Sequence, residues 1–260
     1  MYKMILEAHR GVGTEFPENT LSAFRAAAEQ GYGMIEMDTK FTRDNHCVLL
    51  HDRTVNRTGR RNDGSAIAEK LPVAELTLAE ALELDFGCWK SPLFKGEKIP
   101  TLEQVLDMAL AYKIPLKFDN VLWSHTPEQR DIFFETIIAI KAAHLTEITC
   151  GDITAIQTVR GRLPESKIHY DGPVTSDTIT AISAAVPKDM LTVWLRFDNK
   201  ITSWCKNPPV NKELSDIVKK HGRLGVWLLT EPEELRDAIE IYHADIVETD
   251  GKLKPTNMKG

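Results

Sequence analysis

Apolar stretches of strand length alternate with stretches of helical spacing along almost the whole chain, which predicts an α/β fold built from βαβ units. The chain has 260 residues, and that length suits about eight such units closed into one (β/α)8 barrel of the TIM type. We therefore predict a single barrel domain over residues 1–260. A small insertion is expected after the first strands, at about residues 53–99.

The strands are expected where aliphatic residues cluster between turn residues. They are Met4–Ala8, Met34–Thr42, Cys47–His51, Ile114–Asp119, Glu147–Cys150, Lys167–Tyr170, Met190–Phe197, Arg223–Leu229 and Asp245–Glu248. The second and third are joined by too few residues for a parallel crossover, which needs about a dozen or more. We expect Cys47–His51 to return as the second arm of a hairpin, which would bring His51 close to Asp38.

Helices are expected in the gaps between strands, where apolar residues recur at helical spacing. Thr20–Gln30 stops at Gly31, and Thr101 is an N-cap candidate for a helix that runs to about Tyr112. The other expected helices are Glu128–Ala143, Thr154–Arg160, Ser176–Ala185, Asn211–His221 and Glu231–Tyr242. Residues 53–98 mix charge, glycine and proline with short apolar pieces, as an inserted loop would.

The net charge indicates which partners to expect, and the apolar runs indicate the location. The formal net charge is -6 and the pI is about 5.8, so neither nucleic acid nor an anionic membrane is the expected main partner, because either requires a clustered basic surface. The apolar run before Glu7 is too short for a signal peptide, and no long apolar segment follows. We expect a cytoplasmic protein without stable membrane association, and a homo-oligomer is left open.

Two acidic residues on the second expected strand suggest a cation site. Glu36 and Asp38 are two residues apart, so their side chains share one face of the strand. Two bare carboxylates in a barrel mouth would repel each other unless a cation lay between them, and a hard divalent ion suits oxygen ligands. The alternative is a pair of exposed acids on an edge strand, which the nearby histidine and arginine disfavour.

Two histidines lie at strand ends, where the active face of a parallel barrel is formed. His9 ends the first strand and His51 the return arm, each beside a charged residue, which fits an acid and base pair. Each histidine alone would more simply be a core or surface residue. Arg10 could grip two oxygens of a phosphate. Glu18 and Asn19 precede a helix and could either cap it or belong to the site.

Together these residues resemble the glycerophosphodiester phosphodiesterase family. The resemblance lies in the order and spacing of His9-Arg10-Gly11, Pro17-Glu18-Asn19-Thr20, Ile35-Glu36-Met37-Asp38 and His51-Asp52. Later segments similar to the family are Phe94–Leu102, Val226-Trp227 and Glu248–Asp250. The likeness covers nearly the whole chain and is most specific in the first sixty residues.

The resemblance implies a TIM-type barrel that hydrolyses a glycerophosphodiester to glycerol 3-phosphate and an alcohol. His9 and His51 match the family's acid/base pair, and Arg10 its phosphate contact. Glu36 and Asp38 match two of three ligands to one divalent cation, Mg²⁺ or Ca²⁺. Glu18, Asn19 and Trp227 fall at substrate-binding positions, although Trp227 could equally be a core aromatic. The insertion would lie over the barrel mouth.

The chain departs from the family pattern at the third acidic ligand. The family usually has a glutamate followed two residues later by a lysine, whereas this chain has Asp119 and Val121. Asp119 still offers carboxylate oxygens to a cation, and Val121 removes one positive contact to the phosphate. The aspartate is similar to one in the related sphingomyelinase D branch, but Glu18-Asn19-Thr20 and the insertion favour the first family.

Two other functions remain open from the sequence. One is a non-catalytic binder of phosphodiesters, which the presence of both histidines disfavours because a binder needs no acid/base pair. The other is a phosphodiesterase or phospholipase D-like enzyme acting on lysophospholipid or sugar phosphodiesters. An apolar entrance near Trp194, Phe197 and Trp204 would favour the lipid, and a polar entrance the sugar.

Overall fold

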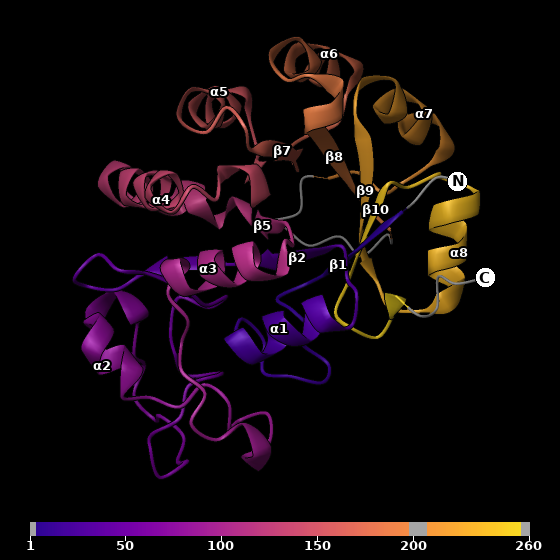
Figure 1. The fold of residues 1–260 in the computed structure, drawn as a ribbon. Coiled ribbons are helices and arrows are strands. Elements are labelled where there is room, and N and C mark those ends of the chain that lie inside the picture. Colours follow the sequence, from indigo (N-terminus) through magenta and orange to yellow (C-terminus); the bar gives the residue numbers. More distant parts are fainter. Residues whose placement is uncertain (1–3, 198–206, 256–260) are drawn as a thin grey trace.

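The computed structural model describes residues 4–197 and 207–255. Within these residues eight parallel strands close into a barrel, in the order β1-β10-β9-β8-β7-β6-β5-β2 (Figure 1). The barrel strands are β1 Ile5–Ala8, β2 Met34–Met37, β5 Leu116–Phe118, β6 Thr146–Cys150, β7 Lys167–Tyr170, β8 Leu191–Arg196, β9 Arg223–Leu229 and β10 Ile246–Thr249. The predicted (β/α)8 fold is confirmed.

Helices surround the barrel in an outer ring (Figure 1). They are α1 Leu21–Glu29, α3 Leu102–Tyr112, α4 Pro127–Ile140, α5 Ile153–Arg162, α6 Ser176–Ala185, α7 Lys212–His221 and α8 Pro232–Glu240. Threonine hydroxyls begin several of them: Thr20, Thr101 and Thr126 each accept a hydrogen bond from the backbone N–H three residues later. Such caps satisfy N–H groups that have no partner within the helix.

The predicted strand Met34–Thr42 is divided at Asp38. β2 pairs with β5 as far as Met37 and Phe118, and the chain then leaves the barrel as β3, Thr39–Phe41, which pairs antiparallel with β4, Cys47–Leu49. The backbone N–H of Asp38 donates a hydrogen bond to Oδ1 of Asn19 at 3.3 Å. The hairpin is thus present as predicted, and Asp38 lies where the chain changes from one sheet to the other.

The inserted segment lies between β4 and α3 and contains α2, Leu78–Leu82. It has its own apolar cluster, formed by Val48, Leu50, Val55, Ile67, Val73, Ala81, Phe86 and Ile99. Its contacts with the loop after β1 include a hydrogen bond from Lys90 to the Gly13 carbonyl at 2.8 Å and the Phe94 ring, whose centre lies 5.3 Å from that of Phe16. The segment therefore packs beside the strand end that carries His9.

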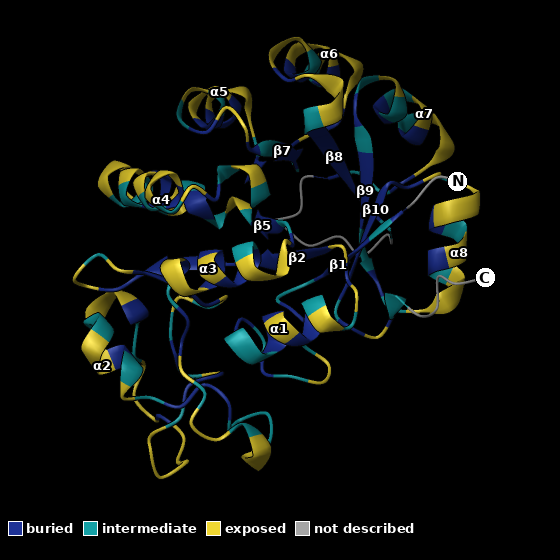
Figure 2. Cartoon of the chain, in the orientation of Figure 1, coloured by how far each residue is buried: buried dark blue, intermediate teal, exposed yellow. Residues whose placement is uncertain are grey.

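All four residues of β2 are buried, but their side chains alternate between the two sides of the strand. Ile35 and Met37 belong to the apolar layer between strands and helices, whereas Met34 packs with Trp194 and Ile246 in a separate cluster. Figure 2 shows the strands buried and the helices buried on one side only. Glu36, two residues after Met34, shares its face and is 3% exposed. The strand thus carries a carboxylate into the interior.

Among the described residues, no helix has both the length and the apolar character needed to cross a bilayer.

Trp194 is the largest fully buried side chain and packs against Gly225 of the neighbouring strand. A Cβ at position 225 would lie 2.6 Å from the indole ring, which is held by a hydrogen bond to His169 and by the ammonium of Lys117 above its face. We expect Gly225→Ala to lower the free energy of unfolding by about 1–3 kcal/mol, the usual cost of overpacking. Denaturant unfolding would measure it.

Gly161→Ala is the matched control for that substitution. Gly161 is exposed on α5, with nothing within 4 Å of an added Cβ. Alanine there should raise stability by about 0.4–1 kcal/mol, because it restricts the unfolded chain. Equal effects of the two alanines would contradict the packing argument.

Candidate active site

A cavity of about 570 Å³ opens at the carboxyl ends of the barrel strands. It lies within the usual size of small-molecule sites and at the face where TIM-barrel active sites form. The residues that line it are His9, Arg10, Glu36, Asp38, His51, Lys117, Asp119, Asn120, Thr149, Gly151, Asp171, Trp194, Asn207, Trp227 and Glu248. Polar and charged side chains dominate, so the cavity suits a polar ligand.

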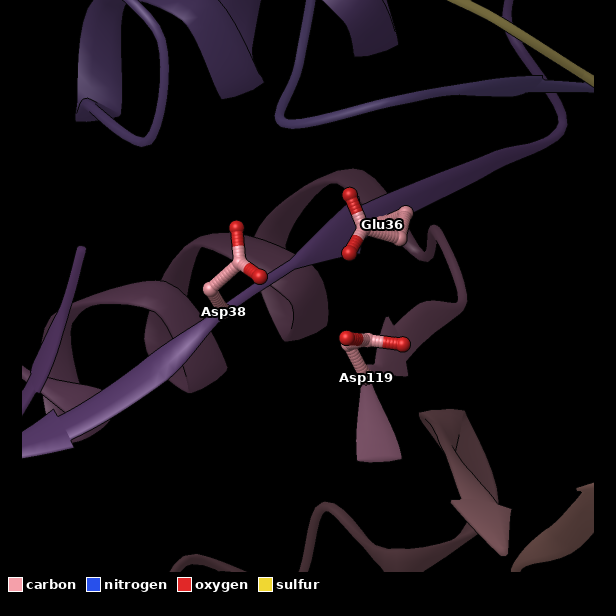
Figure 3. A group of neighbouring side chains, drawn as sticks. All are labelled: Glu36, Asp38 and Asp119. Atoms are coloured by element: carbon pink, nitrogen blue, oxygen red, sulfur yellow. The ribbon is translucent and has the colours of Figure 1, made fainter. Parts of the chain in front are cut away.

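Three carboxylates gather on one wall of the cavity (Figure 3). Glu36 and Asp38 come from the end of β2 and Asp119 from the residue after β5, and one oxygen from each lies within 4.8 Å of the others. Burial, followed by the charge of Asp38, raises the pKa of Glu36 well above its ordinary value and that of Asp119 to about 6. The cluster therefore holds more negative charge than its surroundings balance.

The loop after β1 holds two of these acids in place. Arg10 adopts a left-handed backbone conformation, with φ of 54°, and its N–H donates to Glu36 at 2.9 Å. Its guanidinium lies 3.3 Å from Asp38 and donates to Glu18 at 3.1 Å. Asn19 Nδ2 also donates a hydrogen bond to Asp38 Oδ2 at 2.9 Å. Both residues thus orient the acidic cluster.

A chain of charged contacts connects this loop to His51. Arg57, from the inserted segment, donates to both oxygens of Glu18, at 2.7 and 2.8 Å, and to Asp52 at 2.7 Å. Asp52 accepts a hydrogen bond from His51 Nδ1 at 2.6 Å. The hydrogen bond from Arg57 is the largest influence that lowers the pKa of Asp52 to about 2. The imidazole is therefore oriented by a permanently ionised carboxylate.

A buried lysine fixes the hairpin that carries His51. Lys40 Nζ donates to the carbonyl of Thr39 at 3.1 Å and to that of Leu50 at 3.0 Å. Leu50 N–H also donates to the Asp38 carbonyl at 2.9 Å. These bonds join the start and the end of the hairpin, so His51 remains beside the acidic cluster.

His9 lies between two carboxylates at the other side of the cluster. Its Nε2 is 4.0 Å from Glu36 and 4.0 Å from Glu248. Burial lowers the pKa of His9 despite the opposing charge of Glu248. A neutral imidazole in this position is able to accept a proton.

Lys117 forms the floor of the cavity. Its Nζ lies 2.6 Å from Glu7 and 2.5 Å from Glu248, and 4.0 Å above the ring centre of Trp194. Burial opposes ionisation of Glu248, but Lys117 and then His9 outweigh it and lower its pKa to about 2. Burial raises the pKa of Glu7 although Lys117 opposes it. Lys117 therefore pairs chiefly with Glu248 rather than with Glu7.

The structure brings most of the predicted site residues to one cavity. His9, Arg10, Glu36, Asp38, His51, Asp119 and Trp227 all line it. Glu18 and Asn19 do not: they contact Arg10, Arg57 and Asp38 instead, and Thr20 rather than either of them caps α1.

The sequence left open whether the region near Trp194, Phe197 and Trp204 forms an apolar or a polar entrance. Trp194 is only 2% exposed and its indole N–H donates to His169 at 2.8 Å. Phe197 is half-buried and packs on Tyr242. Trp204 lies outside the described residues. The described part of this region therefore supplies no exposed apolar surface for a lipid chain.

Several cavity or network residues were not predicted from the sequence, among them Lys117, Glu248, Arg57 and Asp171. Lys117 carries a readable signal, because it is two residues before Asp119 and shares its face of β5. Glu248 ends the last strand as His9 ends the first. Arg57 lies in an irregular segment, so no periodic pattern places it.

A barrel with an acidic cluster and two histidines at its carboxyl rim is a fold and site typical of hydrolases that act on phosphate esters. A sequence profile of the glycerophosphoryl diester phosphodiesterase family matches residues 9–224. The chain belongs to this family.

Individual relatives match over shorter regions. A putative glycerophosphodiester phosphodiesterase of Bacillus subtilis is 44% identical over 103 residues, 40% of this chain and 39% of that protein. Human glycerophosphodiester phosphodiesterase 1 is 37% identical over 114 residues, 43% of this chain and 32% of that protein. The chain thus matches about two fifths or less of the length of these relatives.

Solved structures agree with the fold over nearly the whole chain. A putative glycerophosphoryl diester phosphodiesterase from Silicibacter pomeroyi has a TM-score of 0.77 at 21% identity, covering 98% of this chain and 92% of its own. An Oleispira antarctica phosphodiesterase, solved with the product sn-glycerol-3-phosphate, has a TM-score of 0.72 at 19% identity, covering 95% and 93%. Both likenesses show the barrel fold.

We expect Lys117→Met to lower the free energy of unfolding by about 3–5 kcal/mol, since it leaves the buried carboxylate of Glu248 without its cation. Adding Glu248→Gln should recover part of that loss, because the stranded charge is then removed. Adding Glu240→Gln, an exposed change on α8, should recover none. Denaturant unfolding of the three variants tests the pairing, and equal recovery by the two glutamines would refute it.

Proposed function

We propose that this protein is a metal-dependent phosphodiesterase that hydrolyses a glycerophosphodiester to glycerol 3-phosphate and an alcohol. The observation that carries the proposal is the acidic cluster of Glu36, Asp38 and Asp119 in the same cavity as His9 and His51. Family membership and the product bound by the Oleispira protein support the substrate class. We propose further that the chain acts as one barrel domain, with the 53–99 insertion beside the cavity rim.

The acidic cluster has the donor set for one divalent cation. Mg²⁺ and Ca²⁺ both prefer carboxylate oxygens, and burial, followed by the charge of Asp38, raises the pKa values of Glu36 and Asp119, so a cation there would favour the ionised carboxylates. Glu36, Asp38 and Asp119 would hold the ion. When bound, it would supply positive charge to the phosphoryl oxygens of the substrate.

The two histidines would move the protons of the reaction. One would take a proton from the attacking hydroxyl, either water or the 2-hydroxyl of the substrate, and the other would protonate the leaving oxygen. His9 is kept neutral by burial and lies between Glu36 and Glu248. Asp52 engages Nδ1 of His51, which leaves Nε2 for proton transfer.

The remaining polar groups would bind and orient. Arg10 lines the cavity and could donate to a phosphoryl oxygen, while Glu18 and Asn19 would act as positioning residues for Arg10 and Asp38. Trp227 lines the cavity from β9 and would bound the substrate space. The family pattern has a lysine two residues after the third acidic ligand. In this chain Lys117, two residues before Asp119, supplies a positive charge from the same strand at the floor of the cavity.

Release of glycerol 3-phosphate from glycerophosphocholine and glycerophosphoethanolamine, with Mg²⁺, Ca²⁺ or EDTA present, tests this function. We expect turnover with a divalent cation and none with EDTA. His51→Ala should reduce kcat by about 10²- to 10⁴-fold, because a proton-transfer group is lost.

His46→Ala serves as the control in that assay. His46 is on the exposed turn of the same hairpin and does not line the cavity, so its loss should leave kcat unchanged. Full activity of the His51→Ala protein would sink the two-histidine mechanism. Binding of the diester without release of product would instead identify a non-catalytic binder.

The stabilising effect of the cation should depend on pH. In the metal-free protein the raised folded-state pKa of Asp119 means that folding stability is lost as pH rises from about 4 through about 6, and the raised pKa of Glu36 acts in the same direction. A cation opposes this loss only where the carboxylates are ionised. The difference in Tm between Mg²⁺ and EDTA should therefore be small at pH 5 and larger at pH 7.5.

Other groups titrate in this range but cancel in the comparison. Burial lowers the pKa of His125 and of His169 to about 4, so their contribution to stability rises between pH 4 and 6.5 with or without the cation. Asp119→Asn should remove most of the pH dependence of the Mg²⁺ effect, whereas Asp107→Asn, an exposed change on α3, should preserve it. A Tm difference that is the same at both pH values would argue against this site.

A further inference from the structure

The wall of the cavity that faces His9 carries a carboxylate without a role in the mechanism above. Asp171 follows β7, and β7 is four strands from β1 in both directions around the barrel. Parallel strands present their carboxyl ends at one rim, so Asp171 and His9 lie on opposite sides of the same cavity, which both line. A substrate held at the acidic cluster can therefore extend one of its arms toward Asp171.

One oxygen of Asp171 is engaged and the other is free. Asn120 Nδ2 donates to Oδ2, and the backbone N–H of Asp171 is fixed by the Cys150 carbonyl at 3.2 Å. Oδ1 is buried and has no hydrogen-bond partner among the residues that the structure describes. Burial, followed by the charge of Asp119, raises the pKa of Asp171 to about 7. A buried acceptor of this kind requires a donor.

On the neighbouring strand, β6, a buried hydroxyl oxygen also lacks a described hydrogen-bond partner. Thr149 of β6 is 2% exposed, lines the cavity, and its hydroxyl has no described hydrogen-bond partner. Gly151 separates the two positions in the cavity wall, and a Cβ there would lie 3.6 Å from Asp171 Oδ1. Glycine at 151 adds no side chain beside that oxygen. The wall thus contains a carboxylate oxygen and a hydroxyl that are both buried and without a described partner.

The charges of the cavity favour a cationic ligand group at this wall. Lys117 is paired with Glu248, and Arg10 with Glu18 and Asp38. No described lysine or arginine lies within 4.0 Å of an Asp171 oxygen. The aromatic face nearest the cavity floor, that of Trp194, already carries Lys117. That face is therefore not available to a quaternary ammonium, whereas an ammonium with N–H bonds matches an oxygen pair.

We propose that Asp171 and Thr149 form a subsite for a protonated primary amine on the leaving alcohol, so that ethanolamine-type glycerophosphodiesters are the preferred substrates. This inference rests on the proposed function. The ammonium donates to Asp171 Oδ1 and to the Thr149 hydroxyl, and Asn120 holds the carboxylate in place. The glycerol half then occupies the part of the cavity away from β6 and β7.

The test compares three diesters that differ only in the alcohol: glycerophosphoethanolamine, glycerophosphocholine and the methyl ester of glycerol phosphate. Asp171→Asn should reduce kcat/KM for the ethanolamine diester by about 10- to 100-fold, the range for loss of a charged hydrogen bond. The loss should be smaller for the choline diester, which has no N–H, and less than about twofold for the methyl ester. Thr149→Val should change the three substrates in the same order, by smaller factors.

Asp152→Asn is the matched control. Asp152 is exposed, caps α5 through a bond to the Ala155 N–H, and does not line the cavity. Asparagine caps helices as well as aspartate does, so all three substrates should react as with the unchanged protein. An equal loss on all three diesters for Asp171→Asn would overturn the proposal, because Asp171 would then hold the common glycerol half or support the fold. No loss on any would overturn it as well.

Binding separates this inference from the proposed function. If the unchanged protein hydrolyses none of the diesters, the proposed function fails, and calorimetry with phosphoethanolamine, phosphocholine and methyl phosphate in Mg²⁺ still tests the subsite. Phosphoethanolamine should then bind most tightly, and Asp171→Asn should remove that preference. Equal binding of the three ligands would overturn the subsite.

Discussion

Closure of the barrel by pairing of the first and last strands is the constraint on which the site depends. β1 pairs with β10 in the register Ala8 to Thr249, and the His9 N–H donates to the Thr249 carbonyl at 2.8 Å. The same strand pairs on its other side with β2. His9 is thereby placed between Glu248 and Glu36, residues more than two hundred positions apart in the sequence. Without closure the histidine would have one acidic neighbour instead of two.

The interior of this barrel is charged, and that shapes its energetics. Taking charges out of water is costly unless each has a partner. Lys117 balances Glu248, and Arg223 balances Glu147 at 2.9 Å, while neutral His169 donates a hydrogen bond to Glu147 at 2.6 Å. Among the residues that the structure describes, the ion pair of the acidic cluster at the rim is the one that Asp38 makes with Arg10. The charges at the floor of the cavity are therefore paired, whereas those of the acidic cluster at the rim are paired only in part. A cation bound at the rim would balance the remaining negative charge.

The sequence predicted the parts of the site that depend on local spacing. The short link between β3 and β4 required a hairpin, and the two-residue interval between Glu36 and Asp38 placed both on one face. Residues whose place depends on strand register or on an irregular segment were missed. Arg57 is an example: it lies in the insertion, yet it joins Glu18 to Asp52. Glu18 was expected to contact the substrate. Because Arg57 lies beside it, both oxygens of Glu18 instead accept hydrogen bonds from arginines.

The two sides of the cavity differ in how they are built, and under the proposed mechanism this difference would separate the chemistry from selection of the substrate. On the β1 and β2 side, Arg10, Glu18, Arg57, Asp52 and His51 form one connected network, so a change in any of them would disturb the others. On the β6 and β7 side, Thr149 and Asp171 each have an atom that no described residue engages. Substitution there removes a contact to the ligand and little else. A barrel of this construction can alter its choice of alcohol while the proton-transfer geometry stays fixed.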